Sequence, residues 1–195
     1  LNWDYILEKV LSEMNFKIDY GIPLTFTDEI KGKRKRISVL KPHGSLNWKL
    51  CPICENIFAF FENEIWHCKK CHTIFSNEKK LLNDLLKRRI VIKERLIPLL
   101  VTPTFLKSNF VPQLNLILQI FYEYLVEADE LYFIGYSLPL SDHDIRSILI
   151  NAKSLNPKVK VNVILKSKNK TEITRLKNNY TSIYPDNITF DFNGF

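Results

Sequence analysis

Two close pairs of cysteines constrain this 195-residue chain more than any other feature of its sequence. Cys51 and Cys54 form the first pair, Cys68 and Cys71 form the second, and thirteen residues (55–67) separate them. Two tight turns of this kind can present four thiolates to one tetrahedral Zn²⁺ ion, with Zn–S distances of about 2.3 Å. We therefore predict a closed, structural zinc site in a small zinc-ribbon module at about 48–76.

Other uses of four cysteines fit the sequence less well. Two disulfides would suit a secreted protein, a redox pair would use one Cys-x-x-Cys alone, and a catalytic zinc would leave one ligand position open. His67 and His72 flank the second pair and could replace a cysteine, but the four cysteines already complete the metal's coordination.

The composition is that of an ordinary globular chain, with 46% hydrophobic and 25% charged residues. Its length suits one domain, or one domain with a small inserted module. The net charge is +7, and much of the excess lies in residues 31–36, a cationic run without interleaved aromatic residues. Such a run forms a solvated loop or contacts nucleic acid weakly through phosphates. Since neither a membrane helix nor a secretory signal is evident, we expect a cytoplasmic protein without a membrane partner.

The N-terminal half combines short elements around the cysteines. Apolar spacing predicts an amphipathic helix at 3–15, and residues 37–40 are expected to form a strand that ends at Pro42 and Gly44. The segment between the cysteine pairs has the apolar and aromatic content of a hairpin. Beyond it we expect a charged helix at 77–89 and a strand entering a loop at 95–105.

From Pro112 onward, helix and strand patterns alternate three times. This alternation predicts an α/β fold with a Rossmann-like, doubly wound and mostly parallel sheet, which binds ligands at the carboxyl ends of its strands. The first of these strands, 131–134, is almost wholly apolar, so we expect both of its faces to be covered. The helix that follows it is expected to have Ser141 as its N-cap, with Asp144 three residues later.

Four segments, in this order, resemble the sirtuin-like family and most closely its bacterial sirtuin-like domains. The opening "LNWDYILE" is similar to the Thr-x-Asn-x-Asp stretch that precedes a helix in that family, and "KPHGSLNW" is similar to its His-Gly segment. The four-cysteine module follows, as it does in sirtuins. Finally, "ADELYFIGYSLPLSDHDIR" resembles the Gly-Thr-Ser strand end in its Gly-Tyr-Ser form. The resemblance covers residues 2–146.

The resemblance implies a Rossmann-type domain, 1–195, with a zinc-binding insertion and with NAD⁺ as its substrate. Asn2 and Asp4 would flank the nicotinamide ribose, where polar groups can stabilise an oxocarbenium-like state. His43 would be the general base that takes a proton from the attacking hydroxyl or water. The segment implied to approach the dinucleotide is Gly135, Tyr136 and Ser137, with Tyr136 where a threonine is usual.

Two departures from the family shape the expected activity. The chain contains no Gly-x-Gly, and in the family the glycine-rich dinucleotide loop precedes the Asn-x-Asp stretch. We therefore expect the first strand and helix of the fold to be missing here and to be supplied by a partner domain or a second copy. Residues 102–107 lack the Phe-Gly-Glu loop that holds acyl-lysine peptides in deacylating sirtuins. The expected chemistry is hydrolysis of NAD⁺ to nicotinamide and an ADP-ribose product, as in bacterial sirtuin-like defence proteins, with this chain alone weak or inactive.

Three other functions stay open: a protein deacylase, a zinc-ribbon module that binds nucleic acid, and a sirtuin-like scaffold without activity. The residues themselves also allow simpler roles. An Asn-x-Asp at the start of a helix is often only a cap, and a His-Gly pair after a strand is often an ordinary loop histidine.

Overall fold

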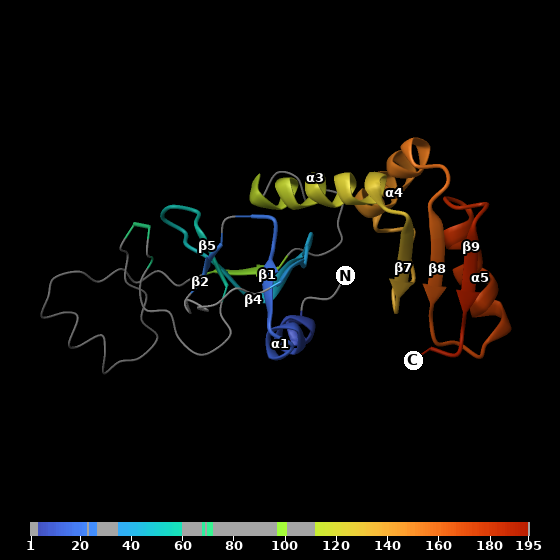
Figure 1. The fold of residues 1–195 in the computed structure, drawn as a ribbon, viewed down its shortest axis with the longest axis horizontal. Helices are drawn as coiled ribbons and strands as arrows, with labels where there is room; N and C mark the ends of the chain where they lie inside the picture. Colours follow the sequence, from blue (N-terminus) through green and yellow to red (C-terminus); the bar gives the residue numbers. More distant parts are fainter. Residues whose placement is uncertain are drawn as a thin grey trace, which may run out of the picture. The chain divides into compact units, whose positions relative to one another are not determined.

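The computed structural model describes residues 4–22, 24–26, 35–59, 68, 70–71, 97–100 and 112–194. They form a mixed α/β structure with parallel strands, in two compact units, Asn2–Val101 and Thr102–Phe195 (Figure 1). Several sequence predictions fall outside the described residues. They are the role of Asn2, most of the cationic run, the helix at 77–89 and the loop at 102–107.

The first unit contains one described helix and six strands. Helix α1 (Ile6–Glu13) lies within the range predicted for it. Strands β1 (Phe16–Asp19) and β3 (Lys35–Ser38) pair in parallel as one small sheet. A second sheet has the order β2-β5-β4-β6. Its strands are β2 (Thr25–Phe26), β5 (Ile57–Ala59), β4 (Gly44–Leu50) and β6 (Ile97–Leu100).

Two details of this unit differ from the sequence prediction. The strand expected at 37–40 is β3, which begins and ends two residues earlier, and Gly44 begins strand β4 rather than ending a strand. Helix α1 buries Glu8 and Leu11, whereas its apolar residues Ile6 and Leu7 are 69% and 56% exposed. The buried face of α1 therefore includes a charged residue, Glu8, which forms an ion pair with Lys41.

The second unit confirms the predicted alternation of helix and strand from Pro112 onward. Its elements are α3 (Pro112–Glu127), β7 (Glu130–Ile134), α4 (His143–Leu155), β8 (Lys160–Ile164), α5 (Lys170–Thr181) and β9 (Ile188–Asp191). The three strands are parallel, in the order β7-β8-β9 (Figure 1). The apolar residues of α3 cover more than one face, a pattern that predicts a largely buried helix, but Leu116 and Tyr124 are 41% and 49% exposed.

The sheet of the second unit is covered on one face by α4 and α5. The covered face packs into a core with both helices, through Phe133, Val161, Val163 and Phe190 among others. On the other face Tyr132 and Ile134 are 59% and 53% exposed. The expectation that the strand 131–134 is covered on both faces is therefore wrong for the described residues. Two successive right-handed crossovers in the same direction place both helices on the same side of a sheet.

Candidate metal centre and candidate catalytic residues

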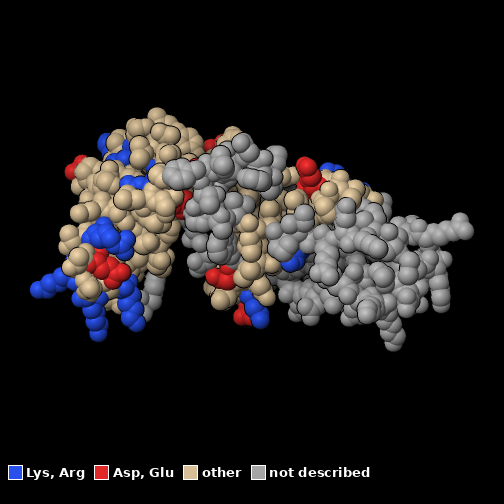
Figure 2. Space-filling model, turned by 180° about the vertical axis from the view of Figure 1, so that it is seen from behind, with Lys and Arg blue, Asp and Glu red and all other residues tan. Residues whose placement is uncertain are grey.

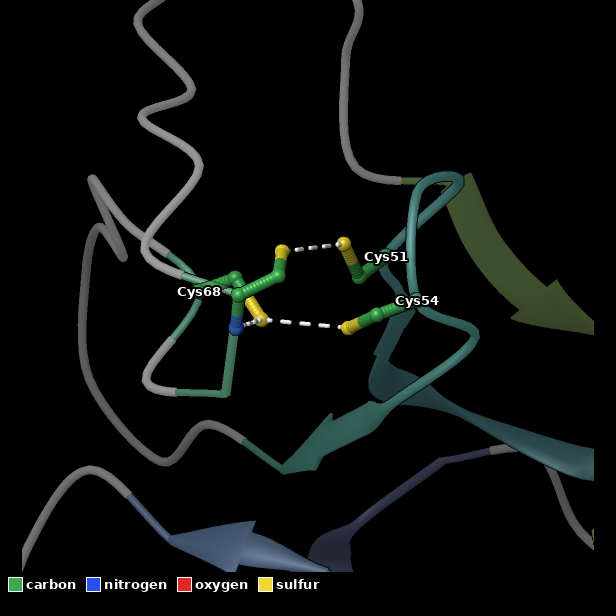
Figure 3. Close-up of side chains that lie close together, drawn as sticks. Cys51, Cys54 and Cys68 are labelled. Atoms are coloured by element: carbon green, nitrogen blue, oxygen red, sulfur yellow. Dashed lines mark hydrogen bonds between the residues drawn. The ribbon is translucent and has the colours of Figure 1, made fainter.

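The four cysteines come together on two turns, as their spacing predicts (Figure 3). Cys51 and Cys54 lie in the turn that joins the antiparallel strands β4 and β5. This turn is closed by hydrogen bonds from the N–H of Cys51 to the carbonyl of Asn56 and from the N–H of Glu55 to the carbonyl of Cys51, both 2.9 Å long. In the second turn, the N–H of Cys71 donates to the Sγ of Cys68 at 3.3 Å.

The distances between the sulfur atoms suit a shared metal ion. Sγ of Cys51 is 3.7 Å from that of Cys71, Sγ of Cys54 is 3.4 Å from that of Cys68, and all four lie within 4.8 Å of one another. Sulfurs at the corners of a tetrahedron around zinc would be about 3.8 Å apart, whereas a disulfide requires about 2.05 Å. The four cysteines form no disulfide, and together they could hold a metal ion such as zinc.

The surroundings of the cysteines favour neutral thiols until a cation binds. Cys51 and Cys68 are fully buried and pack with Phe58. Burial raises the pKa of the Cys51, Cys54 and Cys68 thiols, because a thiolate loses its hydration there. A divalent cation would offset the negative charge of the thiolates, and its binding would therefore release protons.

A buried polar cluster lies where α1 meets the segment that precedes β4. The amino group of Lys41 donates to the carboxylate of Glu8 at 2.5 Å, to the hydroxyl of Ser45 at 3.0 Å and to the main-chain carbonyl of Asp4. Ser45 in turn donates to the side-chain carbonyl of Asn47 at 2.6 Å. Lys41 is 7% exposed and Glu8 is not exposed at all. All three N–H groups of the ammonium therefore have acceptors, as a buried lysine requires.

Tyr20 and Trp48 cover this cluster. The hydroxyl of Tyr20 donates to Glu8 at 3.5 Å, and its ring meets that of Trp48 edge-on, with 5.1 Å between the ring centres. Burial and then the charge of Glu8 raise the pKa of Tyr20 well above its ordinary value, so the phenol stays neutral. The cluster is thus shielded from water by aromatic rings.

His43 lies in a turn that is held on both sides. The turn is closed by a hydrogen bond of 3.0 Å from the N–H of Gly44 to the carbonyl of Lys41, and His43 is 5% exposed. Gly44 has φ +76°, and a Cβ there would lie 2.0 Å from the carbonyl oxygen of Leu99 in β6. Only glycine fits this close approach, which fixes the turn against the sheet.

Two of the three predicted catalytic residues, Asp4 and His43, are described, and a hydrogen bond links the main chain of Asp4 to the segment that carries His43. Asp4 is joined through its main chain to Lys41, two residues before His43. The Asp4 carboxylate also accepts a hydrogen bond from the N–H of Ile6 at 3.1 Å, as a residue at the start of a helix does. Glu8 and Lys41 were not predicted. The signal that could have identified them is that Glu8 shares a helix face with Leu11, the buried side of α1.

Gly135, Tyr136 and Ser137 lie in the second unit, in the loop that follows β7. Gly135 has φ +66°, is exposed, and would have no atom within 4 Å of an added Cβ. Its N–H continues the sheet by donating to the carbonyl of Ile164 at 2.9 Å. The loop thus presents bare backbone at the carboxyl end of a parallel strand, where ligands of such sheets bind.

The loop departs from prediction at its far end. The N-cap of α4 is Asp142, not Ser141, and its side chain makes no capping hydrogen bond. Instead, its buried carboxylate accepts a hydrogen bond of 2.7 Å from the hydroxyl of Tyr136. Burial and this hydrogen bond raise the pKa of Tyr136, so its phenol remains the donor. The carboxylate of the N-cap residue is thus used to hold the loop and not to cap the helix.

Three further side chains hold the loop and were not predicted. Each donates to one of three successive carbonyl groups: Tyr180 to that of Tyr136, Asn179 to that of Ser137 at 3.0 Å, and Arg146 to that of Leu138 at 3.3 Å. Leu138 itself has φ +46°, a conformation that is unfavourable for a residue with a side chain by about 1–2 kcal/mol. Asn179 could have been noticed as a polar residue within the buried stripe of α5.

Charges of both signs lie side by side on the surface of the second unit. On the face shown in Figure 2, Lys and Arg side chains of this unit lie next to Asp and Glu side chains. Two of the ion pairs are Lys160 with Glu130 at 3.3 Å and Arg175 with Glu172 at 3.9 Å. This face therefore does not present an uninterrupted cationic patch of the kind that binds nucleic acid.

No protein-family model matches the chain, and no curated protein matches it. Among the described helices, none is both long and apolar enough to cross a membrane.

Proposed function

We propose that the protein is part of a sirtuin-like enzyme that consumes NAD⁺ by cleaving its nicotinamide–ribose bond. One observation carries this proposal. Asp4 of the Asn-x-Asp stretch and Lys41 of the His-Gly segment, both selected by the resemblance, are 37 residues apart and are joined by a hydrogen bond in one buried cluster that also contains Glu8. An ordinary helix cap and an ordinary loop histidine would not require their two segments to share a buried cluster with an ion pair between Lys41 and Glu8.

In the proposed reaction, the C–N bond between ribose and nicotinamide breaks and its electron pair goes to the ring nitrogen. A water oxygen forms the new bond to the ribose carbon and gives its proton to His43. Asp4 and Asn2 stabilise the positive charge that develops on the ribose. Lys41 and Glu8 do not touch the substrate in this scheme. They hold the main chain of Asp4 and the turn of His43 in place.

The second unit would contribute the dinucleotide site. Its β7-α4-β8-α5-β9 arrangement, with parallel strands and both helices on one face, is what one half of a Rossmann-like, doubly wound sheet looks like. Gly135, with open space beside it at the end of β7, allows a ligand to approach the backbone closely. These features support the proposal and leave the chemistry to be tested.

The cysteine cluster has a structural role in this proposal. Strand β4 begins at Gly44, next to His43, and ends at Leu50, immediately before Cys51. Zinc bound by Cys51, Cys54, Cys68 and Cys71 would fix one end of the strand whose other end carries the catalytic turn. Four cysteine ligands leave no open coordination position, so zinc would take no part in the reaction.

The proposal is tested by following nicotinamide release from NAD⁺, both by this chain and by the chain with any residues its gene encodes before Leu1. We expect release without an added acyl-lysine peptide, together with an ADP-ribose product. Release that depends on the peptide would make the protein a deacylase. Absence of release from both proteins, with zinc bound and the fold intact, would refute the proposal in favour of a scaffold.

A further inference from the structure

The loop between β7 and α4 is held by side chains that come from far along the chain. Three successive carbonyl groups each accept a hydrogen bond from a helix residue. Tyr180 and Asn179 lie on α5, 44 and 42 residues after the carbonyl groups to which they donate. The third donor, Arg146, lies on α4. Tyr180 is fully buried and Asn179 is 7% exposed. No regular secondary structure would otherwise pair these carbonyls.

These contacts determine how the backbone of the loop is oriented. Among the described residues, which include the whole loop, no peptide bond is cis, so each N–H of the loop points opposite to the carbonyl of the same peptide unit. With the carbonyl of Tyr136 directed at Tyr180, the N–H of Ser137 is directed away from that helix. The chain also turns through two residues with positive φ, Gly135 and Leu138, and a leucine does not adopt this conformation readily. The loop therefore needs outside contacts to keep one conformation.

We propose that Tyr180, Asn179 and Arg146 are positioning residues that lock residues 135–138 in a single, binding-ready conformation. This inference rests on the proposed function, in which the loop binds the diphosphate-ribose part of NAD⁺. Loop and ligand meet at Gly135–Ser137, where Gly135 is exposed and Tyr136 and Ser137 are half-buried, whereas Leu138 is buried. The three positioning residues stay behind the loop and do not touch the ligand. Their loss would lower affinity because the loop would spend time in other conformations.

The hydroxyl of Tyr180 offers the sharpest test, because it can be removed without the ring. Tyr180→Phe keeps the packing of the ring against Phe133, whose centre lies 5.1 Å away, and removes only the donor to the Tyr136 carbonyl. Tyr184→Phe is the matched control. Tyr184 is equally buried and also packs near Phe133, but no hydrogen bond from it to the loop is found in the described structure. Arg146→Lys provides a second variant that keeps the charge and loses the planar group that reaches several acceptors.

The first readout is hydrogen exchange of the loop amides in the protein without ligand. We expect Tyr180→Phe to speed exchange at 135–138 by about two- to tenfold, the effect of one lost hydrogen bond, and Tyr184→Phe to leave it unchanged. Arg146→Lys should act in the same direction as Tyr180→Phe. Equal exchange in all variants would overturn the proposal.

The second readout is binding of ADP-ribose, with adenosine as a probe that lacks the diphosphate. We expect the affinity for ADP-ribose to fall by a similar two- to tenfold in Tyr180→Phe and to stay unchanged in Tyr184→Phe, with adenosine insensitive to both. Faster exchange with unchanged ADP-ribose affinity would show that the contacts do not position the ligand, and would overturn the proposal. Faster exchange in a protein that binds no ADP-ribose would leave the lock established and refute the proposed NAD⁺ function instead.

Discussion

Replacing Lys41 with methionine should destabilise the first unit strongly. The substitution keeps an unbranched side chain as far as Cε and removes the charged amino group that balances Glu8, which is 0% exposed and 2.5 Å from it. It also leaves the Asp4 carbonyl and the Ser45 hydroxyl without their donor. Removing one partner of a buried ion pair costs about 3–5 kcal/mol, since the other charge stays buried and unbalanced.

Tryptophan fluorescence during urea unfolding can measure this loss in the first unit alone. All three tryptophans, Trp3, Trp48 and Trp66, belong to Asn2–Val101. The matched control is Arg36→Met, which breaks the pair with Asp19 in the same unit. That pair is 4.0 Å apart and its side chains are 69% and 45% exposed, so the loss should be about 0.5 kcal/mol or less.

A third variant separates the charge from the packing. Lys41→Met combined with Glu8→Leu removes both charges and fills the space with apolar groups, which should recover most of the lost stability. If Lys41→Met alone loses no more than Arg36→Met, the cluster does not hold the two motif segments together, and the structural reasoning behind the catalytic assignment is wrong.

Three further predictions concern the metal site and the turn of His43. Metal analysis of the purified protein should find one zinc per chain, and Cys54→Ser should lower zinc content and the urea midpoint of the tryptophan signal; cysteines found paired as disulfides would contradict the site. Apparent zinc affinity should rise from about pH 6 to about pH 8, because burial raises the thiol pKa and binding must displace protons; an affinity independent of pH would contradict this. Gly44→Ala should destabilise the first unit by more than about 1 kcal/mol, and this loss should exceed the loss that Gly135→Ala causes in the second unit. Both glycines have positive φ, but only at Gly44 would the added Cβ meet the Leu99 carbonyl. Equal losses would show that this close approach does not matter.

The parts of the fold that sequence predicted are those encoded by local patterns. The alternation from Pro112 to Asp191 follows from periodicity, and the cysteine cluster follows from spacing within two turns. Strand β4 was not predicted, because a glycine after a strand pattern indicates the end of a strand. The positive φ of Gly44 instead allows the turn from which β4 starts. A glycine marks an unusual backbone conformation, but it does not say which element lies on which side.

The parts that could not be predicted depend on contacts between distant residues. Glu8 reads as a solvent-facing residue of an amphipathic helix until Lys41, 33 positions later (41 minus 8), is placed beside it. Asp142 lies at the start of a predicted helix, and no local pattern shows that its carboxylate accepts a hydrogen bond from Tyr136. The roles of Asn179 and Tyr180 depend on how α5 packs against the β7 loop, which no local pattern encodes.

The central claim is that His43 is the general base of an NAD⁺-cleaving site, and one comparison tests it most directly. Nicotinamide release should be measured for the unaltered protein, for His43→Ala and for His143→Ala, in which the replaced histidine is exposed at the start of α4. We predict that His43→Ala lowers the rate by roughly 10²-fold or more, the contribution of a positioned acid–base group, and that His143→Ala leaves it unchanged. Equal rates in all three proteins would contradict the assignment of His43.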